Sequence, residues 1–319
     1  MKKQIYIYSP SGAVQDKSAF KRGVKRLDAL GYTVEIDRDA LASQMRFAGD
    51  DATRVAAIHR AAISGADIAL ISRGGYGLSR ILPAIDYALV AKAIGNGTQF
   101  VGFSDFTAFQ MALLAKTGAV SWAGPALGED FGAVAGADDI MEACFDDLMT
   151  GQGEGSGWKL PKFAISSIAS DANAASNSLL GDTYSINDAV LWGGNLTMLA
   201  SLVGTPYIPT IEGGILFIED VGEHPYRIER MLTQLLHAGV LARQKAIIFG
   251  QFSNYQLTPQ DKGYRLASVV DWLQRQVNAK VLTGLPVGHV ATKVVLPVGL
   301  RVTLAVEKRD AFLLWGHGH

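Results

Sequence analysis

The chain has 319 residues, of which 49% are apolar and 18% charged, which is the composition of a globular protein long enough to form two domains. It carries 29 basic and 30 acidic residues, so its formal net charge of -1 gives no electrostatic footprint for nucleic acid or an anionic membrane surface. We therefore expect a small ligand as the partner, with no nucleic acid and no membrane.

The single cysteine and the first residues bear on where the protein works. Cys144 lies in residues 139–149, which are typical of an amphipathic helix, and one cysteine excludes an intramolecular disulfide framework, so we expect a buried structural thiol. Residues 1–10 predict a first strand and contain no apolar stretch long enough for a signal peptide. No window approaches the roughly 20 apolar residues that span a bilayer. We expect a cytoplasmic protein.

Short runs rich in β-branched and aromatic residues alternate with helical patterns through the first half of the chain. Residues 17–30 place Phe20, Val24 and Leu27 on one helical face, and residues 52–64 repeat this pattern. Strands separated by helices of this length predict parallel pairing and right-handed crossovers, and hence a doubly wound, mostly parallel α/β domain. The predicted strands are residues 4–8, 33–36, 67–71, 99–103 and 119–122.

The composition changes between residues 151 and 188, which are small, polar and poor in large apolar side chains. This stretch predicts a linker or a long irregular crossing segment between domains at residues 1–150 and 189–319. The second domain is predicted to be mixed α+β. Its predicted strands are residues 214–220, 246–250, 293–296 and 301–305, and its predicted helices are residues 228–238 and 266–276.

Ser104 is a candidate nucleophile. It follows the predicted strand 99–103 and opens the helical stretch 106–116, and such a turn exposes a hydroxyl at the top of a sheet, beside the first N–H groups of a helix. The match to G-x-S-x-G is incomplete, because Phe106 stands where the second glycine belongs. The pattern also fits a plain helix start, with Ser104 or Asp105 as the N-cap.

A glycine-rich loop, residues 72–77, directly follows the predicted strand 67–71. Because glycine lets the backbone approach a ligand closely, this loop could aim an N–H at a developing negative charge and complete an oxyanion hole with the amide of Asp105. A phosphate cradle and a simple turn are the alternatives. The loop fits neither G-x-G-x-x-G nor the Walker pattern with its lysine, so the sequence favours nucleotide binding less than an oxyanion hole.

A serine nucleophile needs a base, normally histidine, held by a carboxylate. The six histidines are His59, His224, His237, His289, His317 and His319. The first and third fall in helical patterns, the last two in a terminal WGHGH tail, and the second in a turn expected to be solvated. His289 lies in a Pro-Gly loop before a strand, where a base could reach the nucleophile from the second domain.

Two carboxylates, Glu219 and Asp220, end the predicted strand 214–220. A pleated strand sends them to opposite faces, but periodicity does not tell which face is inward, and the plain alternative is a solvated strand end. No H-E-x-x-H motif or paired histidine spacing is present, so we expect no metal site.

Five blocks together resemble the LD-carboxypeptidase family of serine peptidases, which also includes the microcin C immunity peptidases. The similarity runs from the strand and turn at residues 9–12 to about residue 298. The blocks are RGGYG (73–77), GFSDFTA (102–108), GGNLTMLASLVGTPY (193–207), FIEDVGEHPYRIERMLTQL (217–235) and PVGH (286–289).

The resemblance implies a Ser-His-Glu triad in which Ser104 is the nucleophile, His289 the base and Glu219 the carboxylate that orients it. It also implies an oxyanion hole formed by the backbone amides of Gly75, or its neighbour, and of Asp105. Members of this family usually act as homodimers without a cofactor.

Other positions are implied to contact the substrate. Gly74 and Tyr76 belong to the glycine-rich loop, and Trp192 and Asn195 belong to a turn, residues 192–195, expected to line the cleft between the domains. The substrate carboxylate needs a basic partner, for which Arg73 and Arg230 are candidates. Relatives commonly carry histidine where this chain has Ala123, which bears on substrate preference.

The resulting hypothesis is a serine carboxypeptidase that hydrolyses the amide between an L-centre and a terminal D-amino acid. Release of D-alanine from a murein tetrapeptide, in peptidoglycan recycling, is the activity the resemblance implies. One rival is a microcin C immunity-type peptidase acting on aminoacyl or peptidyl adenylate analogues with the same triad. Another is a noncatalytic small-molecule binding protein, in which the glycine loop holds an anion and Ser104 merely caps a helix.

Overall fold

The computed structural model describes residues 2–161 and 183–316 of the chain. Contacts divide the chain into two compact units, and neither is continuous in sequence. The first unit comprises Met1–Gln152, Gly204–Pro209 and Ala291–Gly299, and the second comprises Gly153–Val203, Thr210–Val290 and Leu300–His319.

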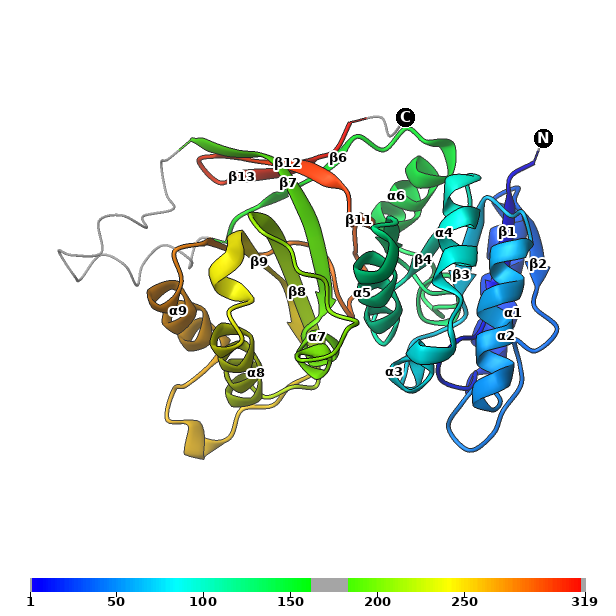
Figure 1. Ribbon diagram of the computed structural model, residues 1–319, viewed down its shortest axis with the longest axis horizontal. Helices are drawn as coiled ribbons and strands as arrows, with labels where there is room; N and C mark the ends of the chain where they lie inside the picture. Colours follow the sequence, from blue (N-terminus) through cyan, green and yellow to red (C-terminus); the bar gives the residue numbers. More distant parts are fainter. Residues whose placement is uncertain (1, 162–182, 317–319) are drawn as a thin grey trace. The chain divides into compact units, whose positions relative to one another are not determined.

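The first unit is built on a six-stranded sheet in the order β11-β5-β4-β3-β1-β2 (Figure 1). Strands β1 to β5 pair in parallel, and β11 is added antiparallel to β5 at the edge. The central strands are buried on both faces, as is usual for a parallel sheet covered by helices. The strands are β1 (Gln4–Tyr8), β2 (Thr33–Ile36), β3 (Ile68–Ile71), β4 (Gln99–Gly102), β5 (Ser121–Ala123) and β11 (Leu296–Val298).

Helices cover both faces of this sheet. Residues of α1, α6 and the helical turn Leu127–Phe131 form one core with side chains of β1, β3 and β4, while α2, α3, α4 and α5 contact one another in a second layer. Helix α5 is buried from Phe106 to Leu114, which explains its continuous apolar sequence. The helices are α1 (Lys17–Ala29), α2 (Asp51–Ile63), α3 (Leu78–Ile81), α4 (Tyr87–Gly95), α5 (Phe106–Thr117) and α6 (Asp139–Thr150).

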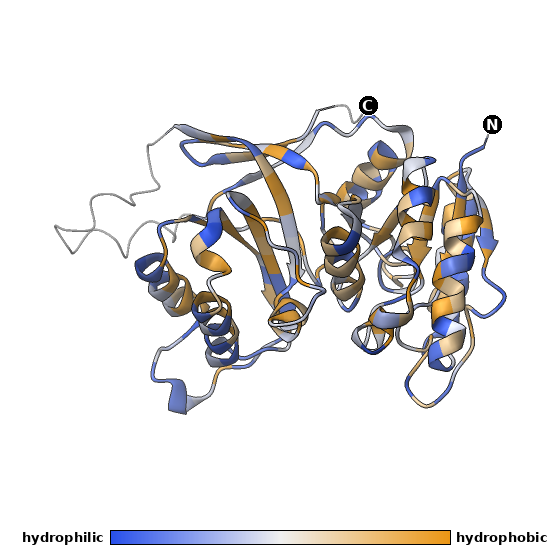
Figure 2. Ribbon diagram, viewed as in Figure 1, coloured by the Kyte–Doolittle hydropathy of each residue, from blue (hydrophilic) through white to orange (hydrophobic). Residues whose placement is uncertain are grey.

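The second unit contains a seven-stranded mixed sheet in the order β10-β9-β8-β7-β12-β13-β6. Strands β7 to β10 are parallel, and β12, β13 and β6 continue the sheet antiparallel. The surface helices α8 and α9 carry both hydrophilic and hydrophobic residues (Figure 2). The strands are β6 (Gly155–Lys159), β7 (Tyr184–Asn195), β8 (Gly214–Val221), β9 (Gln244–Ser253), β10 (Lys280–Thr283), β12 (Arg301–Glu307) and β13 (Asp310–Leu314), and the helices are α7 (Leu196–Leu202), α8 (Pro225–His237) and α9 (Leu266–Gln276).

The predicted fold class is confirmed: a mostly parallel α/β sheet is joined to a mixed α+β part. Three details differ from the sequence analysis. Residues 155–159 and 184–188 form β6 and the start of β7 inside the predicted linker, whose residues 162–182 lie outside the described residues. The strand predicted at 293–296 begins at Leu296 and joins the first unit. Residues 192–195 end β7 and form no turn.

Two further placements concern the remaining expectations. Cys144 is half-buried on α6, where burial raises the pKa of its thiol. Within the described parts of the chain, every helix is too short or too polar to span a bilayer.

Gly193→Ala tests the close pairing of β7 with β8. Gly193 has φ of 133°, and a Cβ there would lie 1.9 Å from the carbonyl oxygen of Phe217 on β8, so alanine must force the strands apart. We expect the free energy of unfolding to fall by at least about 2 kcal/mol in urea titrations. Gly95→Ala, at the open end of α4, is the control and should stabilise by up to about 1 kcal/mol. Equal stability of the two variants would contradict the prediction.

Candidate active site

Ser104 occupies a sharp turn between β4 and α5. Its φ of 64° lies in the left-handed region, which residues other than glycine seldom adopt. The carbonyl of Ser104 accepts a hydrogen bond from the Thr107 N–H at 3.0 Å, so the helix begins immediately after it. Nucleophilic serines of α/β-hydrolases are presented on a strained strand-to-helix turn of this kind.

The glycine-rich loop lies directly against Ser104. A Cβ added at Gly74 would lie 2.8 Å from the Cβ of Ser104 and 2.9 Å from its Oγ. No larger residue fits there unless one of the two segments moves. The structure therefore brings the glycine-rich loop and the turn at Ser104 into contact.

The peptide between Gly74 and Gly75 has a defined orientation. The Gly12 N–H donates to the Gly74 carbonyl at 3.2 Å, and because the peptide is trans, the Gly75 N–H points the opposite way. Among the described residues, neither the Gly75 N–H nor the Asp105 N–H donates to another protein group. Two main-chain donors thus remain available beside Ser104.

Arg73 braces the same loop. Its Nη1 donates to the carbonyl of Ala13 at 3.0 Å, which ties the glycine-rich loop to the segment that follows β1. The neighbouring Tyr76 is 45% exposed, and its ring lies 5.9 Å from that of Phe47. Arg73 was one of two candidates to bind a substrate carboxylate, and part of its guanidinium is already engaged. Arg230, the other, is exposed on α8.

The Asp105 carboxylate joins three loops. It is 1% exposed, and its Oδ2 accepts a short hydrogen bond from Ser11 Oγ and another from the Leu78 N–H at 2.9 Å. It makes no capping bond to α5, so the alternative that Asp105 caps this helix with its side chain is wrong. Burial raises the pKa of Asp105, and the bonds from Ser11 and Leu78 offset this only in part.

Ser11 and Gly12 were not assigned a role from the sequence. They lie in the loop after β1, which ends at Tyr8. Because ligands of parallel sheets bind at the carboxyl ends of strands, this position was the signal that could have identified them.

In the second unit, Glu219 and His289 form a close pair. Nδ1 of His289 lies 2.8 Å from Oε2 of Glu219, which is 2% exposed at the end of β8. The loop bends tightly at Gly288, where a Cβ would lie 3.2 Å from Glu219 and 2.9 Å from the Gln251 carbonyl. A carboxylate that accepts from Nδ1–H leaves Nε2 as the basic ring atom of a neutral imidazole.

Asp220 points away from this pair, as expected for adjacent residues of a strand. Its carboxylate accepts from Asn195 Nδ2 and the Thr197 N–H, both at 2.9 Å, and Asn195 also caps α7. Burial raises the pKa of Asp220. Trp192, also buried, donates its indole N–H to Gln244 at 2.9 Å. These contacts hold the end of β7, and the expected contact of Trp192 and Asn195 with substrate stays a prediction.

Two of the other histidines, His59 and His224, make structural contacts. His224 is the N-cap of α8 and lies 3.2 Å from Asp261, so the expectation of a merely solvated turn is wrong. His59 Nε2 accepts from the Asp86 N–H at 2.9 Å. His317 and His319 lie outside the described residues. Among the residues that are described, no cluster of three His, Cys, Asp or Glu side chains is arranged to hold a metal ion.

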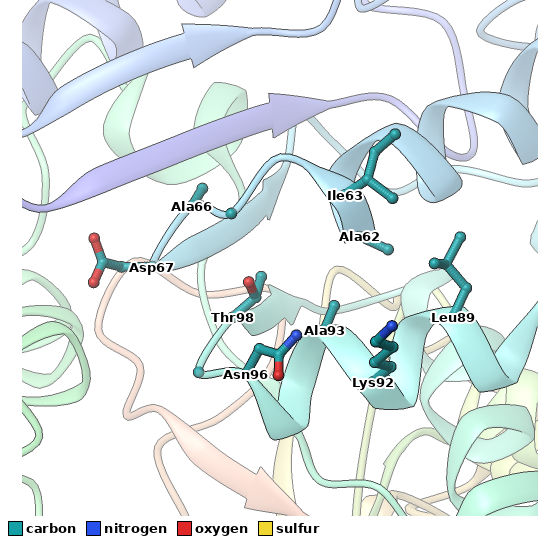
Figure 3. Close-up of a pocket in the computed structure, with 11 residues that line it drawn as sticks. Ala62, Ile63, Ala66, Asp67, Leu89, Lys92, Ala93, Asn96 and Thr98 are labelled. Atoms are coloured by element: carbon teal, nitrogen blue, oxygen red, sulfur yellow. The ribbon is translucent and has the colours of Figure 1, made fainter.

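A pocket of about 340 Å³ lies at the opposite edge of the first sheet, where β3 and β4 begin (Figure 3). Asp67, Lys92 and Thr98 are among its lining residues. Ser104 and the glycine-rich loop follow the carboxyl ends of the same strands. The pocket is therefore separate from the candidate active site.

Comparison with known proteins places the chain in a family. The sequence models of the LD-carboxypeptidase N-terminal and C-terminal domains match residues 5–124 and 188–304. A muramoyltetrapeptide carboxypeptidase from Oxalobacter formigenes has a similar crystal structure, with a TM-score of 0.84 and 39% identity over 98% of this chain and 99% of that one.

Two further relatives match along most of their length. A probable murein peptide carboxypeptidase of Bacillus subtilis is 28% identical over 90% of this chain and 84% of its own. The microcin C7 self-immunity protein MccF of Escherichia coli is 27% identical over 95% and 90%.

The fold and these matches identify the chain as a peptidase of a class that has an N-terminal and a C-terminal domain. The chain belongs to the LD-carboxypeptidase family.

Asp105→Asn tests the pH dependence that burial predicts. Because the pKa of Asp105 is raised in the folded state, its contribution to stability is fully present at acidic pH and is lost as the pH rises from about 4 through the raised pKa. We expect the unfolding free energy of the asparagine variant to fall less over this range than that of the parent. Urea titrations at several pH values measure both, with the exposed Asp28→Asn as the control. Parallel curves for the parent and Asp105→Asn would contradict the prediction.

Proposed function

We propose that the protein is a serine LD-carboxypeptidase in which Ser104 is the nucleophile, His289 the general base and Glu219 the group that orients it. The observation that carries this proposal is the left-handed Ser104 packed against Gly74, beside two unused main-chain donors. A strained serine with oxyanion donors at hand has little structural purpose, whereas acyl transfer needs both features.

The course of the chain supports the participation of His289. Two residues after it, at Ala291, the chain enters the first unit, and Lys293 lies 4.0 Å from the ring of Phe103, the residue before Ser104. Four residues of extended chain span at most about 14 Å. The covalent chain thus keeps the backbone of His289 within about 14 Å of that of Lys293, which supports the assignment of His289 as the base.

In the proposed reaction, His289 Nε2 takes the proton of the Ser104 hydroxyl while Oγ attacks the carbonyl carbon of the scissile amide. The N–H groups of Gly75 and Asp105 stabilise the resulting oxyanion. The intermediate collapses as His289 returns the proton to the leaving amine, which frees the terminal amino acid and leaves an acyl ester on Ser104. Water, deprotonated by His289, then hydrolyses the ester. Glu219 stabilises the imidazolium in both halves of the reaction.

We infer the substrate class from the activity of a relative. The relative from Oxalobacter formigenes is a muramoyltetrapeptide carboxypeptidase, and its 39% identity extends over almost the whole chain. This favours release of D-alanine from a murein tetrapeptide, as in peptidoglycan recycling. We extend the proposal to a homodimer, as the resemblance implies, and to a cytoplasmic location, as expected from the sequence; the mass of the particle in solution tests the dimer.

A second candidate activity rests on the MccF relatives. Structures of MccF with 23% identity include complexes with glutamyl sulfamoyl guanosine and aspartyl sulfamoyl adenosine. The same triad could cleave the acyl bond of such an analogue, and the two candidates differ in substrate rather than in mechanism.

Ser104→Ala should abolish turnover while leaving the fold intact. Removal of the nucleophile typically lowers kcat by about 10⁴-fold or more, because only binding and the oxyanion donors remain. The assay is mass-spectrometric detection of D-alanine released from a murein tetrapeptide, run beside an aminoacyl sulfamoyl adenosine. Ser18→Ala, an exposed serine on α1, is the control.

The outcomes separate the candidate functions. Release of D-alanine by the parent but not by Ser104→Ala supports the carboxypeptidase, and cleavage of the adenosine analogue alone supports the second activity. A noncatalytic binding protein would turn over neither compound, and a fluorophosphonate would not label Ser104. Undiminished release by Ser104→Ala would rule out this nucleophile.

Glu219→Gln should lower kcat by about 10²- to 10⁴-fold with a small change in KM. The amide keeps the size of the carboxylate but no longer stabilises the imidazolium, and it can hold the ring in the wrong tautomer. Steady-state kinetics on the tetrapeptide measure the effect. The control is Glu223→Gln, a partly exposed residue 3.7 Å from Arg227. A kcat equal to that of the control would remove Glu219 from the mechanism.

A further inference from the structure

We propose that the buried ion pair of Lys293 and Asp130 is a positioning device for the active site, which holds the turn at Ser104 against the glycine-rich loop. This inference rests on the proposed function, because it assigns a purpose to the pair in terms of the reaction at Ser104.

The ion pair of Lys293 and Asp130 is almost completely buried. Nζ of Lys293 lies 2.7 Å from Oδ1 of Asp130, and the two side chains are 3% and 5% exposed. Removing two charges from water is costly, and apolar residues of similar volume are often equally stabilising at such a site. Stability alone therefore accounts poorly for a lysine and an aspartate at this place.

On one side, Lys293 contacts the nucleophile turn. Its Nζ lies 4.0 Å from the centroid of the Phe103 ring, a short cation–π contact in a site shielded from water. Phe103 immediately precedes Ser104, so a fixed ring restrains the backbone that carries the nucleophile.

On the other side, Asp130 belongs to a helical turn that also contacts the glycine-rich loop. In this turn, Leu127–Phe131, the Gly128 N–H donates at 2.9 Å to the carbonyl of Ser72, which starts the loop. Oδ2 of Asp130 accepts from the Ala126 N–H at 2.7 Å, which fixes the carboxylate within its own turn.

The helical turn is itself held in place by α1. Arg22 Nε donates to the Gly132 carbonyl at 2.9 Å, and Arg26 donates to the Phe131 carbonyl through a short hydrogen bond. The turn therefore acts as a platform that reaches the glycine-rich loop through Gly128 and the nucleophile turn through the ion pair.

Lys293 also fixes the chain that leaves His289. Next to it, Thr292 Oγ1 donates to Asp138 Oδ2 at 2.6 Å, and three residues later β11 pairs with β5. The ion pair thus lies where the chain coming from the base is attached to the unit that carries Ser104. A misplacement of reacting groups by 1 Å can lower a rate by about 10²-fold.

The experiment compares Lys293→Met, Asp130→Asn and the double variant. Each single variant breaks the ion pair but keeps one of the two buried charges and should be unstable, whereas the double variant removes both charges and should recover much of the thermal stability. Asparagine at 130 keeps an acceptor for the Ala126 N–H. Lys3→Met with Asp67→Asn is the matched control, an exposed pair of the same residue types at 2.9 Å.

The readouts are kcat, KM and the rate at which a fluorophosphonate labels Ser104, each per folded molecule. A positioning role predicts that the double variant stays about 10- to 100-fold below the parent in kcat and in labelling rate, with a much smaller change in KM, although its stability has recovered. The exposed control pair should match the parent in all three.

Two results would overturn the inference. A double variant whose folded molecules react at the parental rate, whether or not stability recovers, would reduce the ion pair to a structural role and leave the proposed function intact. Failure of the parent itself to label at Ser104 would instead refute the proposed function, and this inference with it.

Discussion

The close approach of Gly74 to Ser104 is the constraint on which the candidate active site depends. Ser104 has a left-handed backbone that costs free energy, and such a conformation persists only where the surroundings hold it. Here α5 begins directly after it, and the glycine-rich loop fills the space in front of it with no room for a Cβ at residue 74. The hydroxyl, the loop amides and the helix N-terminus are thereby gathered at one point, which is the arrangement that stabilises an oxyanion.

The buried Asp105 carboxylate also stabilises this arrangement, because it bonds to the neighbouring loops. It bonds to Ser11 after β1 and to Leu78 after the glycine-rich loop, while its own backbone opens α5. Burial makes ionisation of this group unfavourable, and the few bonds that it accepts only partly offset that cost. A polar network of this kind orders loops that have no sheet or helix to order them.

Many strands and helices could be predicted from the local sequence pattern, but many contacts of the candidate active site could not. The predicted bounds of β1 and β2 match the structure, because short β-branched and aromatic runs between helical patterns are local signals. By contrast, the residue pattern left Ser104 open as a helix cap, since a positive φ is imposed by tertiary contacts. It also left open which of Glu219 and Asp220 pairs with a histidine, because both are buried and only the fold brings Glu219 to His289.

The return of residues 291–299 to the first unit is a further feature that local pattern could not give. Lys293 was predicted to start a strand of the second domain, but it is buried against Asp130, far away in sequence. A charged residue beside Val294 and Val295, both buried, was the available hint. Its partner could not be inferred, because pairing over such a separation depends on the path of the chain and not on periodicity.

The carboxyl and amino-terminal edges of the first sheet differ in their polar contacts, and this difference favours the carboxyl edge as the place of the candidate active site. At the carboxyl edge, Ser11, Ser72 and Asp105 are buried polar side chains; Ser11 Oγ donates to Asp105, and Ser72 Oγ bonds to Ser9 Oγ. These bonds order the loops, while the Gly75 N–H donates to no other group of the described residues. At the amino-terminal edge, Asp67 is partly exposed and paired with Lys3. Ligands of parallel sheets bind at the carboxyl ends of the strands, and acyl transfer by a serine requires what this edge offers: ordered main-chain donors beside a strained hydroxyl.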